Sequence, residues 1–269
     1  MDTTVQFAAS YDRTPEGWIK FPEDSDLRKE LFHPSCMGHP AKANIYMYSS
    51  IIDYVSKPGE RVMDIMSGTG TIMIAALRER KVTCIELESF YHPWLDYAKA
   101  SILKAMPQPE GNIMILHGDC RKFLPLPTNH IIFSPPYSDI MVRKKAPTAE
   151  SDKYLAGSYN TTIQHYSASQ GNVGLLGRFL YNQEMERIYK LCYMSLPVNG
   201  TLTIILKDYT EQGKRVFISD WMLKSCVRAG FYIIARFKRH SPGTGYLKLW
   251  KSKGLQVVED EDILIVERR

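Results

Sequence analysis

A serine, two prolines and a tyrosine stand together at Ser134, Pro135, Pro136 and Tyr137, directly after a short apolar segment. Because proline has no N–H for a strand ladder, the pair predicts a rigid turn at the carboxyl end of a strand over 130–133. The Ser134 hydroxyl and the Pro135 carbonyl are acceptors, and Tyr137 offers an aromatic plate. This set suits a planar ring whose exocyclic amino group gives its protons to both acceptors. Such hydrogen bonds favour a pyramidal nitrogen with a reactive lone pair; a simple proline turn is the alternative.

A glycine turn further upstream predicts a cofactor site. It follows a predicted strand over 61–65 and leads into a predicted helix over 71–80. Glycines allow a ligand to approach the backbone, and free N–H groups at a helix start attract its polar atoms. The dinucleotide fingerprint is absent, because Met73 stands where its last glycine would be, and a tight turn without a ligand is the alternative. The expected cofactor contacts in this turn are Asp64, Ser67, Gly68, Thr69, Gly70 and Thr71.

Two acidic residues stand at the ends of the next two predicted strands. Glu86 ends the strand 82–86, about 20 residues after the glycine turn, where an acid can accept hydrogen bonds from ribose hydroxyls. Asp119 follows the strand 112–117 and could accept from an adenine amino group. A solvent-exposed acid is the alternative for Glu86, and a helix N-cap is the alternative for Asp119.

Strands and helices alternate along most of the chain. Strands are expected at 61–65, 82–86, 112–117, 130–133, 200–206, 231–237 and 262–266, and helices at 41–55, 71–80, 93–106, 182–195 and 214–229. This alternation predicts an α/β fold with a doubly wound, mainly parallel sheet of seven strands. No helix separates the last two strands, so an antiparallel strand should close the sheet.

The chain is expected to form one domain over 1–269. Residues 1–36 are polar and turn-rich and are expected to form an irregular extension. Residues 138–181 are rich in Ser, Thr, Gly and Tyr and are expected to form an inserted recognition loop, since a loop of this length inside a compact domain is usually functional. Residues 236–254 are expected to form a basic connection between the last two strands.

The formal net charge of +5 comes from one part of the chain. Residues 1–220 hold 24 basic and 24 acidic residues, whereas 221–258 hold eight basic residues and no acidic ones. The basic connection should leave the carboxyl edge of the sheet and line the catalytic face; a solvated basic surface is the alternative. The expected nucleic-acid contacts are Arg143, Lys144 and Lys145 in the inserted loop, and Arg236, Lys238 and Arg239 in the connection.

Several function classes are disfavoured by composition. No apolar run approaches the length of a membrane span, and the N-terminus lacks the pattern of a signal peptide. The five cysteines are scattered and form no CxxC motif, which indicates a reducing compartment and predicts neither disulfides nor a metal site. We therefore expect a cytoplasmic protein without a membrane partner.

Taken together, these residues resemble the S-adenosylmethionine-dependent amino-methyltransferases of DNA, which act on cytosine N4 or adenine N6. The resemblance extends over nearly the whole chain and includes solitary bacterial or phage members. Its most specific part is the serine-proline-proline-tyrosine motif with the upstream glycine turn. Supporting segments are Phe32 to Pro34, His39 to Lys42, Gly171 to Gly174 and Ile205 to Tyr209.

The resemblance implies roles for the residues named above. S-adenosylmethionine would lie over Gly68 and Gly70, with Glu86 on its ribose and Asp119 on its adenine. A flipped base would stack on Tyr137 and react by direct displacement, with catalysis mostly by positioning. Serine in the motif is more typical of cytosine-N4 enzymes, whereas adenine-N6 enzymes more often carry aspartate there.

Two departures from the family affect the expected specificity. Ile65 stands where many relatives have proline, which changes the stiffness of the cofactor loop. No separate target-recognition domain is expected after the sheet closes. Recognition would have to come from residues 138–181, from the block after Phe231, from a partner, or from a second protomer in a homodimer.

The implied function is methylation of cytosine N4 in duplex DNA by a bacterial, archaeal or phage-encoded enzyme of the restriction-modification type. Methylation of adenine N6 in DNA, and of a base amino group in RNA, are alternatives within the same chemistry. An inactive subunit that binds cofactor and nucleic acid is an alternative of another class, which the intact motif disfavours. A small-molecule methyltransferase is disfavoured by the basic block and the base-gripping motif.

Overall fold

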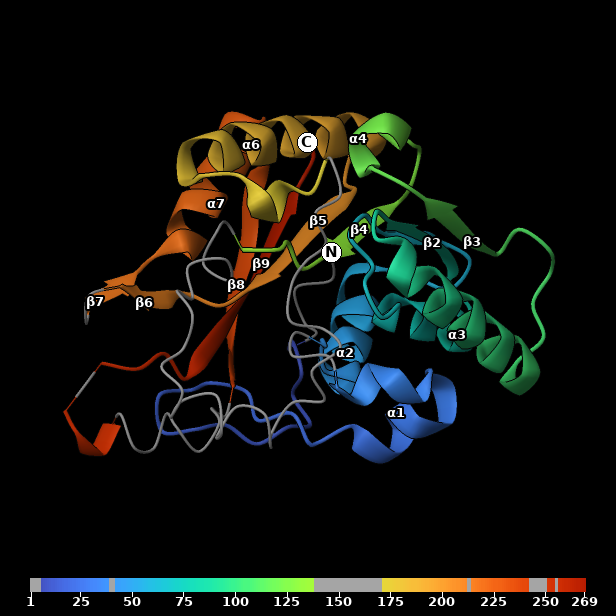
Figure 1. Ribbon diagram of the computed structural model, residues 1–269, viewed down its shortest axis with the longest axis horizontal. Coiled ribbons are helices and arrows are strands. Elements are labelled where there is room, and N and C mark those ends of the chain that lie inside the picture. The colour runs from blue at the N-terminus through green and yellow to red at the C-terminus, as the bar shows by residue number, and fades with distance from the viewer. Residues whose placement is uncertain (1–5, 39–41, 138–170, 212–213, 242–250, 255) are drawn as a thin grey trace, which may run out of the picture.

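A computed structural model describes residues 6–38, 42–137, 171–211, 214–241, 251–254 and 256–269. At its centre is a seven-stranded sheet in the order β3-β2-β1-β4-β5-β9-β8 (Figure 1). These strands are β1 (Arg61–Asp64), β2 (Lys81–Glu86), β3 (Ile113–His117), β4 (His130–Phe133), β5 (Thr201–Leu206), β8 (Tyr232–His240) and β9 (Asp260–Glu267). β9 is antiparallel to β5 and β8, and the other paired strands are parallel. The predicted doubly wound, mainly parallel sheet with an antiparallel closing strand is confirmed.

Helices cover both faces of the sheet. α2 (Ile45–Val55), the 3-10 helix η2 (Thr71–Arg78) and α3 (His92–Ala105) pack on one face, and α6 (Arg178–Ser195) and α7 (Ile218–Arg228) pack on the other (Figure 1). Alternate strand residues enter the two cores: Ile205 and Ile263 join the first, and Ile204 and Leu264 join the second. Burial on both faces explains why these strands are continuous apolar runs in the sequence. None of the described helices is long and apolar enough to cross a membrane.

The N-terminal region differs from the predicted irregular extension. It contains α1 (Ser25–Leu31) and the 3-10 helix η1 (Pro34–Gly38). Ile19 is fully buried; its N–H donates to the Lys238 carbonyl at 2.9 Å, and its carbonyl accepts from His240 at 2.8 Å. Arg28 is also buried and donates to the Thr71 hydroxyl at 3.3 Å. These contacts are long-range, so local periodicity could not reveal them. The hydrogen bond from Arg28 to Thr71 connects this segment to the end of the glycine turn.

The region after β5 also differs from the prediction of one helix over 214–229. A hairpin of β6 (Tyr209–Glu211) and β7 (Lys214–Val216) comes first, and α7 begins only at Ile218. The Arg215 side chain binds Asp208 at 2.9 Å and Asp260 at 2.7 Å. These partners are distant in sequence, which explains why the hairpin carries little local signal. α6 likewise begins at Arg178, four residues before its predicted start.

Candidate active site

The strand order explains why the two main motifs meet. β1 pairs directly with β4, with Val62 opposite His130 and Met63 opposite Ile131. The glycine turn follows β1 and the proline motif follows β4, so both lie at the carboxyl ends of neighbouring parallel strands. The chain order also reverses between these strands, and ligands of doubly wound sheets bind in the crevice at such a point.

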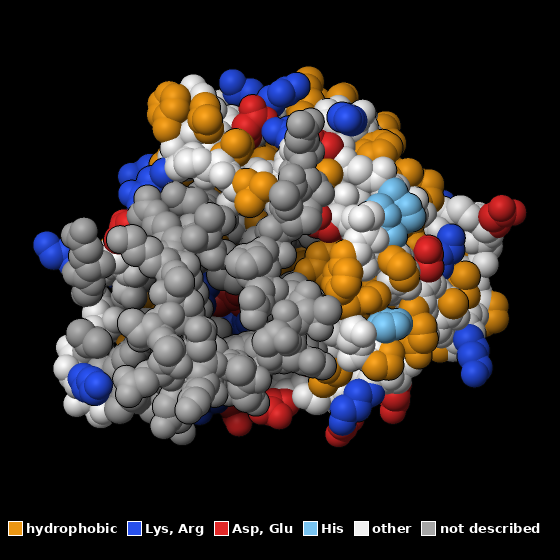
Figure 2. Space-filling model, viewed as in Figure 1, with side chains coloured by type: hydrophobic (Ala, Val, Ile, Leu, Met, Phe, Trp, Pro, Cys, Tyr) orange, Lys and Arg blue, Asp and Glu red, His pale blue; other side chains and the backbone are white. Residues whose placement is uncertain are grey.

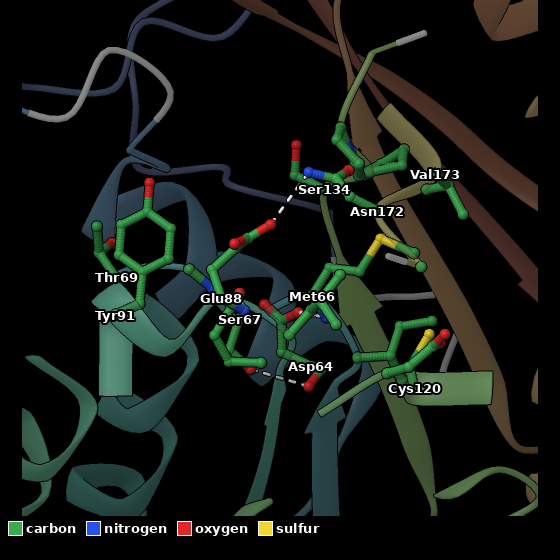
Figure 3. A pocket seen from close by; sticks show the side chains of 18 of the residues that line it. Asp64, Met66, Ser67, Thr69, Glu88, Tyr91, Cys120, Ser134, Asn172 and Val173 are labelled. Atoms are coloured by element: carbon green, nitrogen blue, oxygen red, sulfur yellow. Dashed lines mark hydrogen bonds between the residues drawn. The ribbon is translucent and has the colours of Figure 1, made fainter. Parts of the chain in front are cut away.

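An open cleft of about 1010 Å³ lies at this edge. All the predicted catalytic and cofactor residues except Gly70 line it. The cleft is also lined by residues that sequence reasoning did not identify, among them Tyr48, Glu88, Tyr91, Arg121 and Asn172. Figure 3 shows side chains from the ends of several strands pointing into this space.

The glycine turn has a left-handed backbone at both glycines, with φ of 49° at Gly68 and 78° at Gly70. A Cβ added at Gly70 would lie 2.7 Å from the Leu95 side chain of α3. Ser67 closes the turn, because its hydroxyl donates to the Asp64 carbonyl at 2.9 Å. Gly70 therefore allows the turn to pack against α3, while the neighbouring residues face the cleft.

Asp64 is buried at the end of β1. Its carboxylate accepts from the Met66 amide at 2.9 Å and from the Tyr48 hydroxyl at 3.2 Å. Burial raises the pKa of Asp64 to about 7. Within the described residues, these contacts make Asp64 the residue that fixes the start of the turn, at the base of the cleft.

Glu86 connects the end of β2 to the same turn. Its carboxylate accepts from the Gly68 amide at 2.5 Å and from the Glu88 amide at 2.8 Å. Burial raises the pKa of Glu86 to about 7. The carboxylate therefore lines the cleft next to the glycine backbone.

Asp119 both lines the cleft and caps the short helix α4 (Cys120–Phe123), so the N-cap alternative from the sequence is also realised. It accepts from the Arg121 amide at 2.9 Å and from the Arg121 guanidinium at 2.6 Å. Burial by itself would raise the pKa of Asp119, but the hydrogen bonds from Arg121 outweigh it and lower that pKa. Asp119 is consequently an ionised acceptor at neutral pH.

The proline motif carries two acceptors that have no hydrogen-bond partner among the described residues. These are the hydroxyl of the partly exposed Ser134 and the carbonyl of the buried Pro135. The next carbonyl, that of Pro136, accepts from the Tyr181 hydroxyl at 2.8 Å. The Tyr137 hydroxyl accepts from the Lys207 amide at 2.8 Å. The motif is therefore held from α6 and from the end of β5, while its first two acceptors stay available.

Asn172 and Glu88 form a buried pair beside the proline motif. The sequence did not predict this pair. The Asn172 amide donates to the Glu88 carboxylate at 3.0 Å, and Figure 3 shows this pair next to Ser134. Asn172 also accepts from the Gly174 amide at 2.8 Å, at the start of η4 (Val173–Leu175). The Gly171–Gly174 segment was a supporting part of the resemblance, but only the tertiary structure brings it to the cleft.

The cysteine in the cleft is not suited to nucleophilic attack. Burial raises the pKa of Cys120 to about 12, so it is a neutral thiol at physiological pH. The described residues hold no group of three or more His, Cys, Asp or Glu side chains arranged for a metal ion.

The predicted nucleic-acid contacts fall into two groups. Arg143, Lys144 and Lys145 lie outside the described residues. The other three lie within β8, not in the loop after it, so the predicted basic connection over 236–254 is corrected at its start. Each of them forms ion pairs: Arg236 with Asp220 and Asp262, Lys238 with Asp260 and Asp262, and Arg239 with Glu261.

No protein-family model matches the sequence, and no curated protein sequence matches it. Among solved structures, the chain is similar to TrmN from Thermus thermophilus, with a TM-score of 0.51 and 14% identity over 84% of this chain and 49% of that one. The chain thus spans about half the length of TrmN. A methyltransferase from Pyrococcus furiosus follows with a TM-score of 0.48 and 14% identity over 86% of each chain. A TehB-like SAM-dependent methyltransferase from Corynebacterium glutamicum has a TM-score of 0.46 and 12% identity over 91% of this chain and 96% of that one.

The sheet order and the similarity to TrmN show that the chain has the Rossmann-like fold of class I methyltransferases. S-adenosylmethionine, the cofactor expected from the sequence, is compatible with this site. The cleft offers a close backbone approach at Gly68, a carboxylate at Glu86 and a second carboxylate at Asp119.

Proposed function

We propose that the protein is an S-adenosylmethionine-dependent methyltransferase that modifies the exocyclic amino group of a nucleic-acid base, with cytosine N4 in DNA as its target. The observation that carries this proposal is the pair of available acceptors, the Ser134 hydroxyl and the Pro135 carbonyl, beside the Tyr137 ring. An amino group has two protons, and this pair can accept both. The acceptors share one cleft with the glycine turn, so methyl donor and methyl acceptor can meet there.

The cofactor would be held at the glycine turn. Gly68 allows close contact with the backbone, Glu86 would accept from ribose hydroxyls, and Asp119 would accept from the adenine amino group. S-adenosylmethionine supplies a methyl group on a positively charged sulfur, which makes that methyl carbon electrophilic. The chain has to supply orientation and a route for one proton.

The proline motif would perform these tasks. Tyr137 would stack on the flipped base, and the cost of flipping is a few kcal/mol. Ser134 and the Pro135 carbonyl would hold the amino protons and localise the lone pair on nitrogen. After transfer, the surplus amino proton would leave through the Ser134 hydroxyl to water. Positioning of this kind accounts for much of the rate enhancement available to a displacement reaction.

The direct test is a methyl-transfer assay with labelled S-adenosylmethionine. Duplex DNA, single-stranded DNA and total RNA are offered separately, and modified nucleosides are identified by mass spectrometry. We expect N4-methylcytosine from DNA. N6-methyladenine, or a methylated base from RNA alone, would select another acceptor within the same chemistry. The absence of any methylated nucleoside would contradict the proposal.

A Ser134→Ala variant tests the assigned acceptor. Loss of a positioned hydrogen-bond group should lower kcat by about 100-fold or more, while cofactor affinity stays near that of the unchanged protein. Ser50→Ala is the matched control, because the Ser50 hydroxyl donates to the Tyr46 carbonyl within α2 and does not line the cleft. Near-full activity of Ser134→Ala would remove Ser134 from the mechanism.

A further inference from the structure

A second hollow, of about 610 Å³, shares the lining residue Tyr137 with the cleft. Its walls include five aromatic side chains and one guanidinium, those of Tyr137, Tyr181, Tyr209, Phe217, Trp221 and Arg178. We call it the aromatic hollow. Tyr137 lines both this hollow and the cleft, so the two spaces meet at this residue.

Three segments join the Tyr137 segment to build the aromatic hollow. The start of α6 provides Arg178 and Tyr181, and β6 provides Tyr209. Phe217 precedes α7, and Trp221 lies in its first turns. Figure 1 shows α6, the β6–β7 hairpin and α7 gathered on one side of the sheet. The hollow is therefore a product of the tertiary fold and does not belong to any one element.

Three of the five rings of the hollow are held by hydrogen bonds at their edges. The hydroxyls of Tyr137 and Tyr181 bind the Lys207 amide and the Pro136 carbonyl, each at 2.8 Å. The Tyr209 hydroxyl accepts from the Arg178 guanidinium at 3.0 Å. Rigid rings with anchored edges present preformed apolar faces to a ligand, which reduces the entropy cost of binding.

Phe217 is unusually exposed for an apolar side chain at a concave surface. It is 56% exposed, and the Arg215 guanidinium carbon lies 5.3 Å from its ring centroid. Arg178, with 53% of its side chain exposed, also lines the hollow, where its guanidinium forms an ion pair with the Glu211 carboxylate at 2.9 Å. Because both guanidiniums already have carboxylate partners, the exposed ring face is what the hollow offers a ligand, and a planar base suits such a face.

We propose that the aromatic hollow binds a second base of the nucleic-acid strand, the neighbour of the base that enters the cleft. This inference rests on the proposed function, and it adds a subsite to it. Because the two spaces share Tyr137, a strand whose target base occupies the cleft would reach the hollow beside that residue. Stacking in the hollow would hold the strand there with little dependence on sequence, since every base has an aromatic face.

The test compares a base-bearing strand with a base-free one. Phe217→Ala removes a half-exposed ring, so the fold should tolerate it. Binding is measured by fluorescence anisotropy with a labelled single-stranded oligodeoxycytidine and with an abasic oligomer of equal length. We expect the substitution to lower the affinity for the oligodeoxycytidine by about 5- to 100-fold, the range for loss of one base–aromatic stack. The affinity for the abasic oligomer should stay nearly unchanged.

Tyr232→Ala is the matched control. Tyr232 is 53% exposed and begins β8, away from the hollow, so its loss should change neither affinity. The subsite would be overturned if Phe217→Ala lowered the affinity for both oligomers equally or left both affinities unchanged. It would also be overturned if the unchanged protein did not bind oligodeoxycytidine. A shift from dimer to monomer caused by Phe217→Ala would overturn it as well, because a second copy would then occupy the hollow.

The subsite and the proposed function fail in different ways. If the unchanged protein methylates a nucleic acid while Phe217→Ala binds and methylates normally, only the subsite is wrong. If the unchanged protein methylates no nucleic acid, the proposed function falls, whatever Phe217→Ala does to binding.

Discussion

At the scale of single residues, the main feature is the difference between neighbouring carbonyls in the proline motif. Pro136 has a fixed donor in Tyr181, whereas the Pro135 carbonyl and the Ser134 hydroxyl have none among the described residues. Proline provides no N–H of its own, so nothing local competes for these acceptors. We therefore expect Tyr181 to act as a positioning residue, because its hydroxyl holds the turn through the Pro136 carbonyl.

Substitution of Tyr181 by phenylalanine tests this positioning. The variant keeps the ring but loses the hydrogen bond to the Pro136 carbonyl, so the available acceptors should lose their alignment. We expect kcat to fall by about 10-fold and the KM for S-adenosylmethionine to stay unchanged. Steady-state kinetics of methyl transfer give both values.

The same helix supplies the control for this experiment. The Tyr189 hydroxyl is buried and has no hydrogen-bond partner in the described part of the chain. Tyr189→Phe should therefore leave kcat unchanged, and it should not lower stability, since it removes an unsatisfied polar group. Equal losses of activity in Tyr181→Phe and Tyr189→Phe would contradict a positioning role for Tyr181.

At the scale of elements, the β6–β7 hairpin depends on a buried ion network. Arg215 joins Asp208, at the end of β5, to Asp260, at the start of β9, and both carboxylates are almost completely buried. Burial would raise the pKa of Asp260, but hydrogen bonds from Arg215 and Lys238 outweigh it and lower that pKa to about 2. The network also lies close to the motif, because Lys207, which precedes Asp208, donates its amide to Tyr137.

Replacing Arg215 by methionine should destabilise the protein, because two buried carboxylates would lose a cation. The free energy of unfolding should fall by about 3 kcal/mol, as is typical when one partner of a buried ion pair is removed. Urea denaturation followed by circular dichroism measures this change. In the control Arg187→Met, the side chain is 63% exposed and lies 3.9 Å from Glu184, so the change should stay within about 0.5 kcal/mol. Similar losses in both variants would contradict the network.

At the scale of the whole molecule, the positive charge is less concentrated than its place in the sequence indicates. The basic residues of β8 lie opposite the acidic residues of β9, so two segments of opposite charge neutralise each other across one strand pair. On the face shown in Figure 2, the described Lys and Arg side chains are scattered among acidic ones. Arg143 to Lys145 lie outside the described residues, so their contribution to binding stays a prediction.

A triple variant, Arg236→Gln, Lys238→Gln and Arg239→Gln, measures how much of this charge serves nucleic-acid binding. A free cation on a DNA phosphate contributes about 0.9 to the slope of log affinity against log salt. All three cations already have acidic partners. We therefore expect the slope to change by less than the sum of the contributions that three free cations would make. We also expect the thermal stability to fall. A loss of all three contributions at unchanged stability would show that these residues contact phosphates as free cations.

The sequence by itself determined the sheet, its closing strand and the two motifs at its carboxyl edge. Strands buried on both faces need continuous apolar runs, and turns next to a ligand need glycine or proline. Both requirements are local, so they can be recognised one segment at a time. The predicted residues around Gly68, Glu86 and Ser134 could be named for this reason.

Only the tertiary structure decided which other groups meet those residues. The contact between Asn172 and Glu88 joins positions 84 residues apart, and that between Tyr181 and Pro136 joins positions 45 apart. The same holds for Arg28 against the glycine turn, for the β6–β7 hairpin, and for the ion pairs that neutralise β8. Hydrogen bonds and ion pairs of this kind depend on which elements pack together. A charge or an aromatic ring therefore has the same appearance in the sequence whether it is paired, buried or free to bind.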